Sequence, residues 1–119
     1  MYSAPLLDHF QNPRNAGELA DADAAAEIQN PVCGDVLRLT LNVRAGCISE
    51  VRFKAKGCVP AMACASALTE LVAGKTLEQV RMLRREDVID AVGGVPQAST
   101  HAAQLSMDVL SAALRQIKS

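Results

Sequence analysis

The stretch VLRLTLNVRAGCISEVRFKAK, residues 36–56, decides the fold. Apolar and polar residues alternate from Val36 to Val43 and again from Val51 to Lys56. Such alternation is typical of half-buried β-strands, because successive side chains of a strand point to opposite faces. Residues 44–47, Arg-Ala-Gly-Cys, lie between the two runs and have the composition of a turn. The stretch therefore predicts an antiparallel hairpin, and a third strand is expected ahead of it near residues 25–29.

The residues on either side of this hairpin have helical patterns. A short helix is expected over residues 5–10, with Pro5 in its first turn. The later helices are expected over residues 60–73, from the capping sequence at 76–79, over 86–92, and from residue 99 to the C-terminus. Strands followed by helices indicate an α+β fold, a small antiparallel three-stranded sheet with helices packed on one face. A chain of 119 residues fits one such domain, residues 1–119.

The composition narrows the classes of function. The formal net charge is −1 and no basic block is present, so the sequence lacks the basic footprint of a nucleic-acid-binding surface. No apolar run approaches the roughly 20 residues that span a bilayer, and the N-terminus has no secretory signal pattern. We therefore expect a cytoplasmic protein that binds neither nucleic acid nor membranes. In a reducing cytosol its 4 cysteines are expected to be free thiols, metal ligands or nucleophiles rather than disulfides.

Two of the candidate functional positions lie at the ends of the hairpin. Cys33 and Asp35, just before it, offer a thiol and a carboxylate two residues apart that can share one metal ion. Cys58 follows it, at the predicted N-terminus of the helix over 60–73, after a glycine that permits a sharp reversal. Unpaired N–H groups at a helix N-terminus stabilise a thiolate, the form that binds metal or attacks sulfur. A buried packing cysteine is the alternative interpretation of Cys58.

The third candidate is His101, in Ser99-Thr100-His101 at the start of the last helix. A helix N-terminus disfavours imidazolium and leaves a neutral ring that can coordinate metal. The alternative is an exposed or capping histidine.

The remaining histidine and cysteines are interpreted as structural. His9 lies in the first helix, and Cys47 is expected to be a surface thiol in the hairpin turn. Cys64 shares a helical stripe with Leu68 and Leu71, which predicts core packing. It also lies six residues beyond Cys58, a spacing that places the two on different helix faces.

Four segments carry a resemblance when they are taken in order. Residues 8–15, DHFQNPRN, are similar to a DHYxNPRN signature, and residues 31–35, PVCGD, to a PxCGD loop. Residues 52–58, RFKAKGC, are similar to an RFKxxGC segment, and Thr100-His101-Ala102 lies where a His-Cys pair is usual. Over essentially its whole length the chain resembles the iron–sulfur cluster assembly scaffold family, of the IscU/NifU N-terminal type.

The resemblance implies a site and partners. It implies that Cys33, Asp35, Cys58 and His101 are ligands for zinc, for iron or for a [2Fe–2S] cluster. It also implies a scaffold rather than an enzyme, with a cysteine desulfurase and recipient apo iron–sulfur proteins as partners. Two features depart from the family. Ala102 replaces its third cysteine, a principal sulfur acceptor, and residues 95–99, VPQAS, lack the hydrophobic-proline-lysine segment that some members offer to a chaperone.

Three functions remain open from the sequence. The first is a scaffold or carrier of iron–sulfur cluster or of its iron precursor. The second is a non-assembling, zinc-binding paralogue that binds and regulates a cysteine desulfurase. The third is a zinc-dependent sulfurtransferase with Cys58 as the sulfur-accepting thiol. Ala102 favours the second, whereas retention of all four ligands argues against simple decay of the site.

Overall fold

The computed structural model of the chain describes residues 2–31 and 34–117. The predicted hairpin is present: β2 (Val36–Arg44) pairs antiparallel with β3 (Cys47–Lys56). Ala45 and Gly46 connect them with φ values of 53° and 76°. Two positive φ values give a tight hairpin turn whose twist matches that of the strands.

The third strand lies on the other side of β2. β1 (Ala24–Gln29) pairs antiparallel with β2, so the order of strands in the sheet is β1-β2-β3. Its bounds agree with the strand expected near residues 25–29. Each edge strand has one residue bonded outside the sheet: Asn15 and Gly17 bond to Phe53 of β3, and the amide side chain of Gln116 bonds to the backbone of Ala25 in β1.

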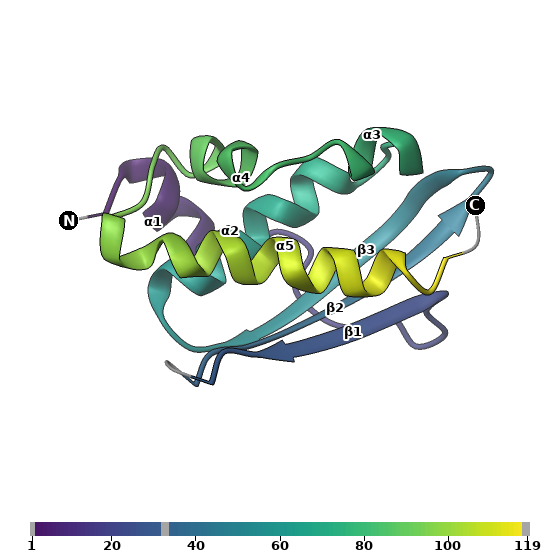
Figure 1. Cartoon of the computed structure of the whole chain (residues 1–119), viewed down its shortest axis with the longest axis horizontal. Coiled ribbons are helices and arrows are strands. Elements are labelled where there is room, and N and C mark those ends of the chain that lie inside the picture. Colours follow the sequence, from purple (N-terminus) through teal and green to yellow (C-terminus); the bar gives the residue numbers. More distant parts are fainter. Residues whose placement is uncertain (1, 32–33, 118–119) are drawn as a thin grey trace.

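The helices lie above one face of the sheet (Figure 1). They are α1 (Ala4–Gln11), α2 (Val59–Val72), α3 (Leu77–Arg81), α4 (Arg85–Ala91) and α5 (Thr100–Leu114), with a short 3-10 turn at Gln97–Ser99 before α5. The α+β prediction, three antiparallel strands with helices on one face, is confirmed. The expected extension of the last helix to the C-terminus is wrong, because α5 ends at Leu114.

The core lies between the sheet and helices α2 and α5. Leu37, Leu39 and Leu41 of β2 are buried on the helix-facing side, and α2 is buried on most of its surface. Apolar contacts of this kind stabilise the domain by roughly 25 cal/mol for each Å² removed from water. No helix in the described part of the chain has the length and apolar character needed to cross a bilayer.

Candidate metal site

Three junctions of the fold meet at one end of the sheet. Asp35 directly precedes β2, Cys58 is the N-cap of α2, and His101 is the second residue of α5. Because Val36 is paired with Lys56, the start of β2 lies beside the end of β3, from which the chain turns into α2. The strand register therefore brings Asp35 to Cys58, and the packing of α5 across β1 and β2 adds His101.

The donor atoms of these three residues have the spacing of a metal centre. The Sγ of Cys58 is 3.4 Å from Oδ2 of Asp35, and Nε2 of His101 is 3.6 Å from the same oxygen. All three donor atoms lie within 4.8 Å of one another. Zinc bonds of about 2.0–2.3 Å in a tetrahedron give donor separations of about 3.3–3.7 Å. The two short separations match this range, so the group can hold one ion.

Asp35 is held in place by the segment that leads into α2. Its side chain is buried, with a residue exposure of 3%. The backbone N–H of Cys58 donates to Oδ1 at 3.1 Å. Gly57, with φ of +153°, leaves room for this carboxylate, since a Cβ there would lie 2.1 Å from Oδ1. A glycine is required because the carboxylate occupies the space of its missing side chain.

His101 is oriented by a backbone carbonyl. Its Nδ1 lies 3.2 Å from the carbonyl oxygen of Ala98, at the turn that precedes α5. With the proton on Nδ1 donated to this carbonyl, Nε2 keeps its lone pair and points to Asp35. A backbone carbonyl behind a histidine is a usual support for a metal ligand, because it sets both the tautomer and the ring orientation.

The electrostatics of Cys58 differ from the sequence-based expectation. Burial raises the pKa of the Cys58 thiol, the backbone N–H of Ala61 lowers it, and the hydrogen bond and charge of Asp35 raise it further. The stabilisation of a thiolate at the N-terminus of α2 is thus present but outweighed, and the prediction of a thiolate is wrong for the ion-free protein. A bound cation would favour the thiolate again, because its charge offsets burial and the neighbouring carboxylate.

The other predicted residues fall in three groups. Cys33 lies outside the described residues and stays a prediction. Cys64 is fully buried, and burial together with the nearby Cys58 raises its pKa to about 12, which agrees with core packing. Cys47 lies at the far end of β3, roughly 30 Å from the site at about 3.4 Å per residue. It is half-buried rather than a surface thiol, because it forms a β-bridge with Thr76.

His9 is structural, as expected. It is buried, with Nδ1 2.8 Å from the hydroxyl of Ser66 and Nε2 3.4 Å from Glu70. The same hydroxyl accepts the backbone N–H of Arg14 at 2.8 Å, and Arg14 also pairs with Asp8 at 2.6 Å. The DHFQNPRN segment therefore fastens α1 and the following turn to α2.

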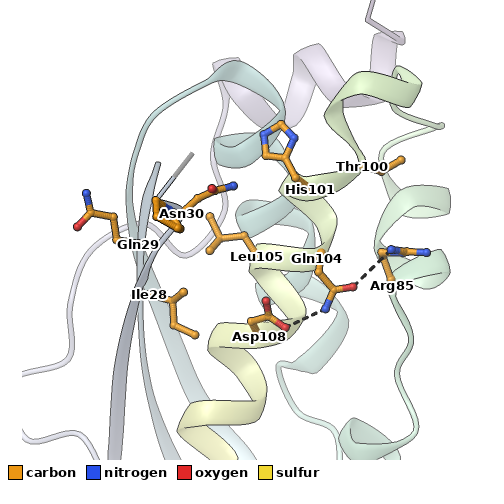
Figure 2. Close-up of a pocket in the computed structure, with 10 residues that line it drawn as sticks. Ile28, Gln29, Asn30, Arg85, Thr100, His101, Gln104, Leu105 and Asp108 are labelled. Atoms are coloured by element: carbon orange, nitrogen blue, oxygen red, sulfur yellow. Dashed lines mark hydrogen bonds between the residues drawn. The ribbon is translucent and has the colours of Figure 1, made fainter. Parts of the chain in front are cut away.

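The sequence-based interpretation missed a groove beside His101. It has a volume of about 490 Å³ and lies between the end of β1, α5 and Arg85 of α4 (Figure 2). Gln104 of α5 bridges it, accepting from Arg85 at 3.5 Å and donating to Asp108 at 2.8 Å. His101, Gln104 and Asp108 follow one another at i, i+3 and i+7, which is one helix face. This spacing of polar residues could have predicted the groove from the sequence. The groove leaves His101 open to solvent on this side.

The family model and the similar proteins indicate the same family. The family model described as "NifU-like N terminal domain" matches residues 1–119. The chain is 40% identical over 114 residues to iron-sulfur cluster assembly scaffold protein IscU 1 of Archaeoglobus fulgidus, covering 96% of this chain and 74% of that protein. It is 34% identical over 122 residues to the scaffold protein IscU of Escherichia coli K12, covering 99% and 94%.

A solved structure supports the fold. The N-terminal NifU-like protein of Brucella abortus superposes with a TM-score of 0.80 over 97% of this chain and 92% of that one. Its sequence identity of 22% carries the fold alone. The family model and the two relatives carry more than the fold, since both identities exceed 30% over most of each chain. This chain belongs to the NifU-like N-terminal domain family.

Proposed function

We propose that this protein is an iron–sulfur cluster assembly scaffold or carrier that holds its cargo at Cys33, Asp35, Cys58 and His101. One observation carries the proposal: Asp35, Cys58 and His101 come from three separate elements, and their donor atoms lie within 4.8 Å of one another. The relatives named as assembly scaffolds, at 34–40% identity, support the same function. Cys33, two residues before Asp35, would supply a second thiolate.

The donor set suits a cargo that must be taken up and released. Thiolates and imidazole bind zinc and ferrous iron well, whereas a carboxylate is a harder ligand that exchanges more easily. The backbone N–H of Cys58 holds the Asp35 carboxylate, and Gly57 leaves the space that the carboxylate occupies. The carboxylate is thus preorganised. Among the described residues no arginine or lysine forms an ion pair with it, so it is free to exchange. Sulfur would come from a cysteine desulfurase, and the product would pass to recipient apo iron–sulfur proteins.

A second candidate function is a zinc-binding paralogue that regulates a cysteine desulfurase without assembling clusters. The observation in its favour is Ala102, which follows His101 and is fully buried with no donor atom. If the family's third thiol belongs at this position, the site has only Cys33 and Cys58 as possible thiolates. Such a site still holds zinc, but it lacks one sulfur acceptor.

Anaerobic reconstitution tests the proposal. The protein is incubated with ferrous iron, cysteine and a purified desulfurase, and bound iron, acid-labile sulfide and visible absorption are measured. A scaffold retains iron and sulfide in equal amounts, and Cys58→Ala loses both. Cys47→Ser is the matched control, because Cys47 lies at the opposite end of β3 and the substitution leaves the site intact.

The two functions predict different outcomes. Tight zinc binding without sulfide uptake would contradict the scaffold. If the zinc-loaded protein then changed the rate of the desulfurase at stoichiometric amounts, and the Cys58→Ala variant did not, the regulator would be supported.

A further inference from the structure

A second groove lies away from the metal site, between α3 and the C-terminal half of α5. It has a volume of about 390 Å³. Figure 1 shows α3 above the end of α5 that is coloured yellow. Val80 and Leu110 are buried in the groove, and partly exposed apolar side chains line the rest of it: Leu83, Met107, Leu114 and Ile117.

The charged residues of this groove have a single sign. Arg81 and Arg115 line it, and no carboxylate does among the described residues. Neither arginine forms an ion pair within the described part of the chain. Each lies at the C-terminal end of a helix, where the helix dipole favours a cation. The helix dipole explains why an arginine lies at each of these helix ends. It does not explain why an apolar groove lies between the two arginines.

The surface next to the groove is apolar too. Met82, adjacent to Arg81, is 75% exposed, and the other large exposed hydrophobic residue in the described ranges is Leu7, at 37%. Methionine is flexible and polarisable, so Met82 and Met107 can adapt to a partner's side chains. Exposed apolar surface rimmed by polar residues marks interaction sites.

We infer that this groove is a docking surface for an amphipathic helix of a partner protein, apolar on the face that enters and acidic on its flanks. From Met107 to Leu114 the groove follows about 10 Å of α5, at 1.5 Å per residue, which matches about two turns of a docked helix. Carboxylates on the flanks would make charge-assisted hydrogen bonds to Arg81 and Arg115, whose planar guanidinium groups suit carboxylates.

This surface is independent of the metal site. The first lining residue on α5, Met107, comes six residues after His101, and the groove beside His101 uses a different set of α5 residues. A helix docked here leaves the opening next to His101 uncovered. The inference therefore stands whether the site carries a cluster, iron or zinc.

Peptide titrations test the inference on the full, ¹⁵N-labelled chain. Three synthetic helical peptides share one apolar ridge at i, i+3, i+4 and i+7 and differ only in flanking residues, which are all Glu, all Gln or all Lys. We expect the Glu peptide to bind at least tenfold more tightly than the Lys peptide, with chemical-shift changes on α3 and the second half of α5. Added salt should reduce this difference, because exposed charges are screened.

Charge reversal supplies the decisive variant. In Arg81→Glu/Arg115→Glu the order of affinities should invert, so that the Lys peptide binds best. The matched control is Lys54→Glu/Lys56→Glu, which changes the net charge equally at exposed positions of β3 and should keep the original order. Unchanged thermal unfolding of both variants shows that the fold is retained.

Three results would overturn the inference. Equal affinity for the three peptides, or shift changes outside α3 and α5, would remove the basis for an acidic partner helix. Tighter binding to phosphatidylserine vesicles than to any peptide would assign the groove to membranes. Self-association that protects the groove from the Glu peptide would assign it to a second copy of this chain.

Discussion

Gly57 has two roles: it leaves space for the Asp35 carboxylate, and it adopts a φ of +153°. Replacing it by alanine, alone and together with Asp35→Ala, should separate the two. The new Cβ would lie 2.1 Å from Oδ1 of Asp35 and 2.7 Å from its Cγ. Asp35 is buried and short, so its carboxylate must rotate away and lose the N–H of Cys58. The substitution therefore displaces a proposed ligand while every donor atom stays in the chain.

The magnitude follows from two contributions. Loss of a hydrogen bond to a buried carboxylate costs about 1.5–3 kcal/mol. A side chain at a φ of +153° adds strain of about 1–3 kcal/mol. We expect a loss of about 2.5–6 kcal/mol in the free energy of unfolding and a 10- to 100-fold weaker zinc affinity, the usual effect of disturbing a ligand's support.

The assay is a double-mutant cycle with Asp35→Ala. Zinc affinity is measured by competition with a chromogenic chelator at low temperature, and amide exchange at Cys58 reports the hydrogen bond to Asp35 directly. Once Asp35 is alanine the clashes with Oδ1 and Cγ are gone and the 3.0 Å approach to the Cβ of residue 35 remains, so Gly57→Ala should then change zinc affinity less than about threefold. Gly46→Ala is the control: its φ of +76° gives backbone strain, but no atom lies within 4 Å of the new Cβ.

Two results would refute this reasoning. Wild-type zinc affinity in Gly57→Ala would show that Asp35 is not a ligand or is not held by this contact. An equal loss of affinity with and without Asp35 would show that the backbone strain, and not the carboxylate, is responsible.

Three further predictions concern other parts of the chain. Ala102→Cys should increase the sulfide retained per chain on reconstitution, at a cost of about 1–3 kcal/mol for overpacking a buried position; no increase would show that a missing thiol does not limit the protein. Burial and the charge of Arg14 lower the pKa of His9, against the opposing charges of Glu70 and Asp8. In the metal-free protein the free energy of unfolding should therefore be highest above pH 6.5, about the unfolded pKa of histidine, and should fall as the pH drops below it. Urea unfolding of His9→Gln should lack this fall, and a variant that retains it would contradict the assignment to His9. Thr76→Ala removes the hydroxyl that accepts the Gln79 N–H at 3.0 Å and should cost about 1 kcal/mol, or about 4 °C in the unfolding temperature, with zinc binding unchanged.

Much of the fold could be predicted because its signals are local. Alternation over residues 36–56 predicts both hairpin strands, since side-chain direction in a strand depends only on the residue's position. The Thr76–Gln79 capping box is likewise contained in four residues, and its two reciprocal hydrogen bonds are present. The end of α5 was missed because apolar spacing continues to Ile117, whereas the helix itself stops at Leu114.

The candidate site, too, could be predicted only in part. The residue types at Asp35, Cys58 and His101, and their places at the ends of elements, are properties of the sequence alone. Their donor spacing is not, because it depends on the register of β2 against β3 and on the packing of α5, which join residues far apart in the chain. The protonated state favoured for Cys58 was also missed, since burial and the neighbouring carboxylate outweigh the helix N-terminus.

The sequence by itself determined the order of strands and helices, the donor types and the family, because periodicity, capping and motifs depend on residues that are close together in the chain. Only the tertiary structure decided that three of the donors meet at the spacing of one ion. It alone placed the Asp35 carboxylate against Gly57, and it alone formed an apolar groove between Arg81 and Arg115. Distances and desolvation arise when separate elements pack together, and no local pattern contains them.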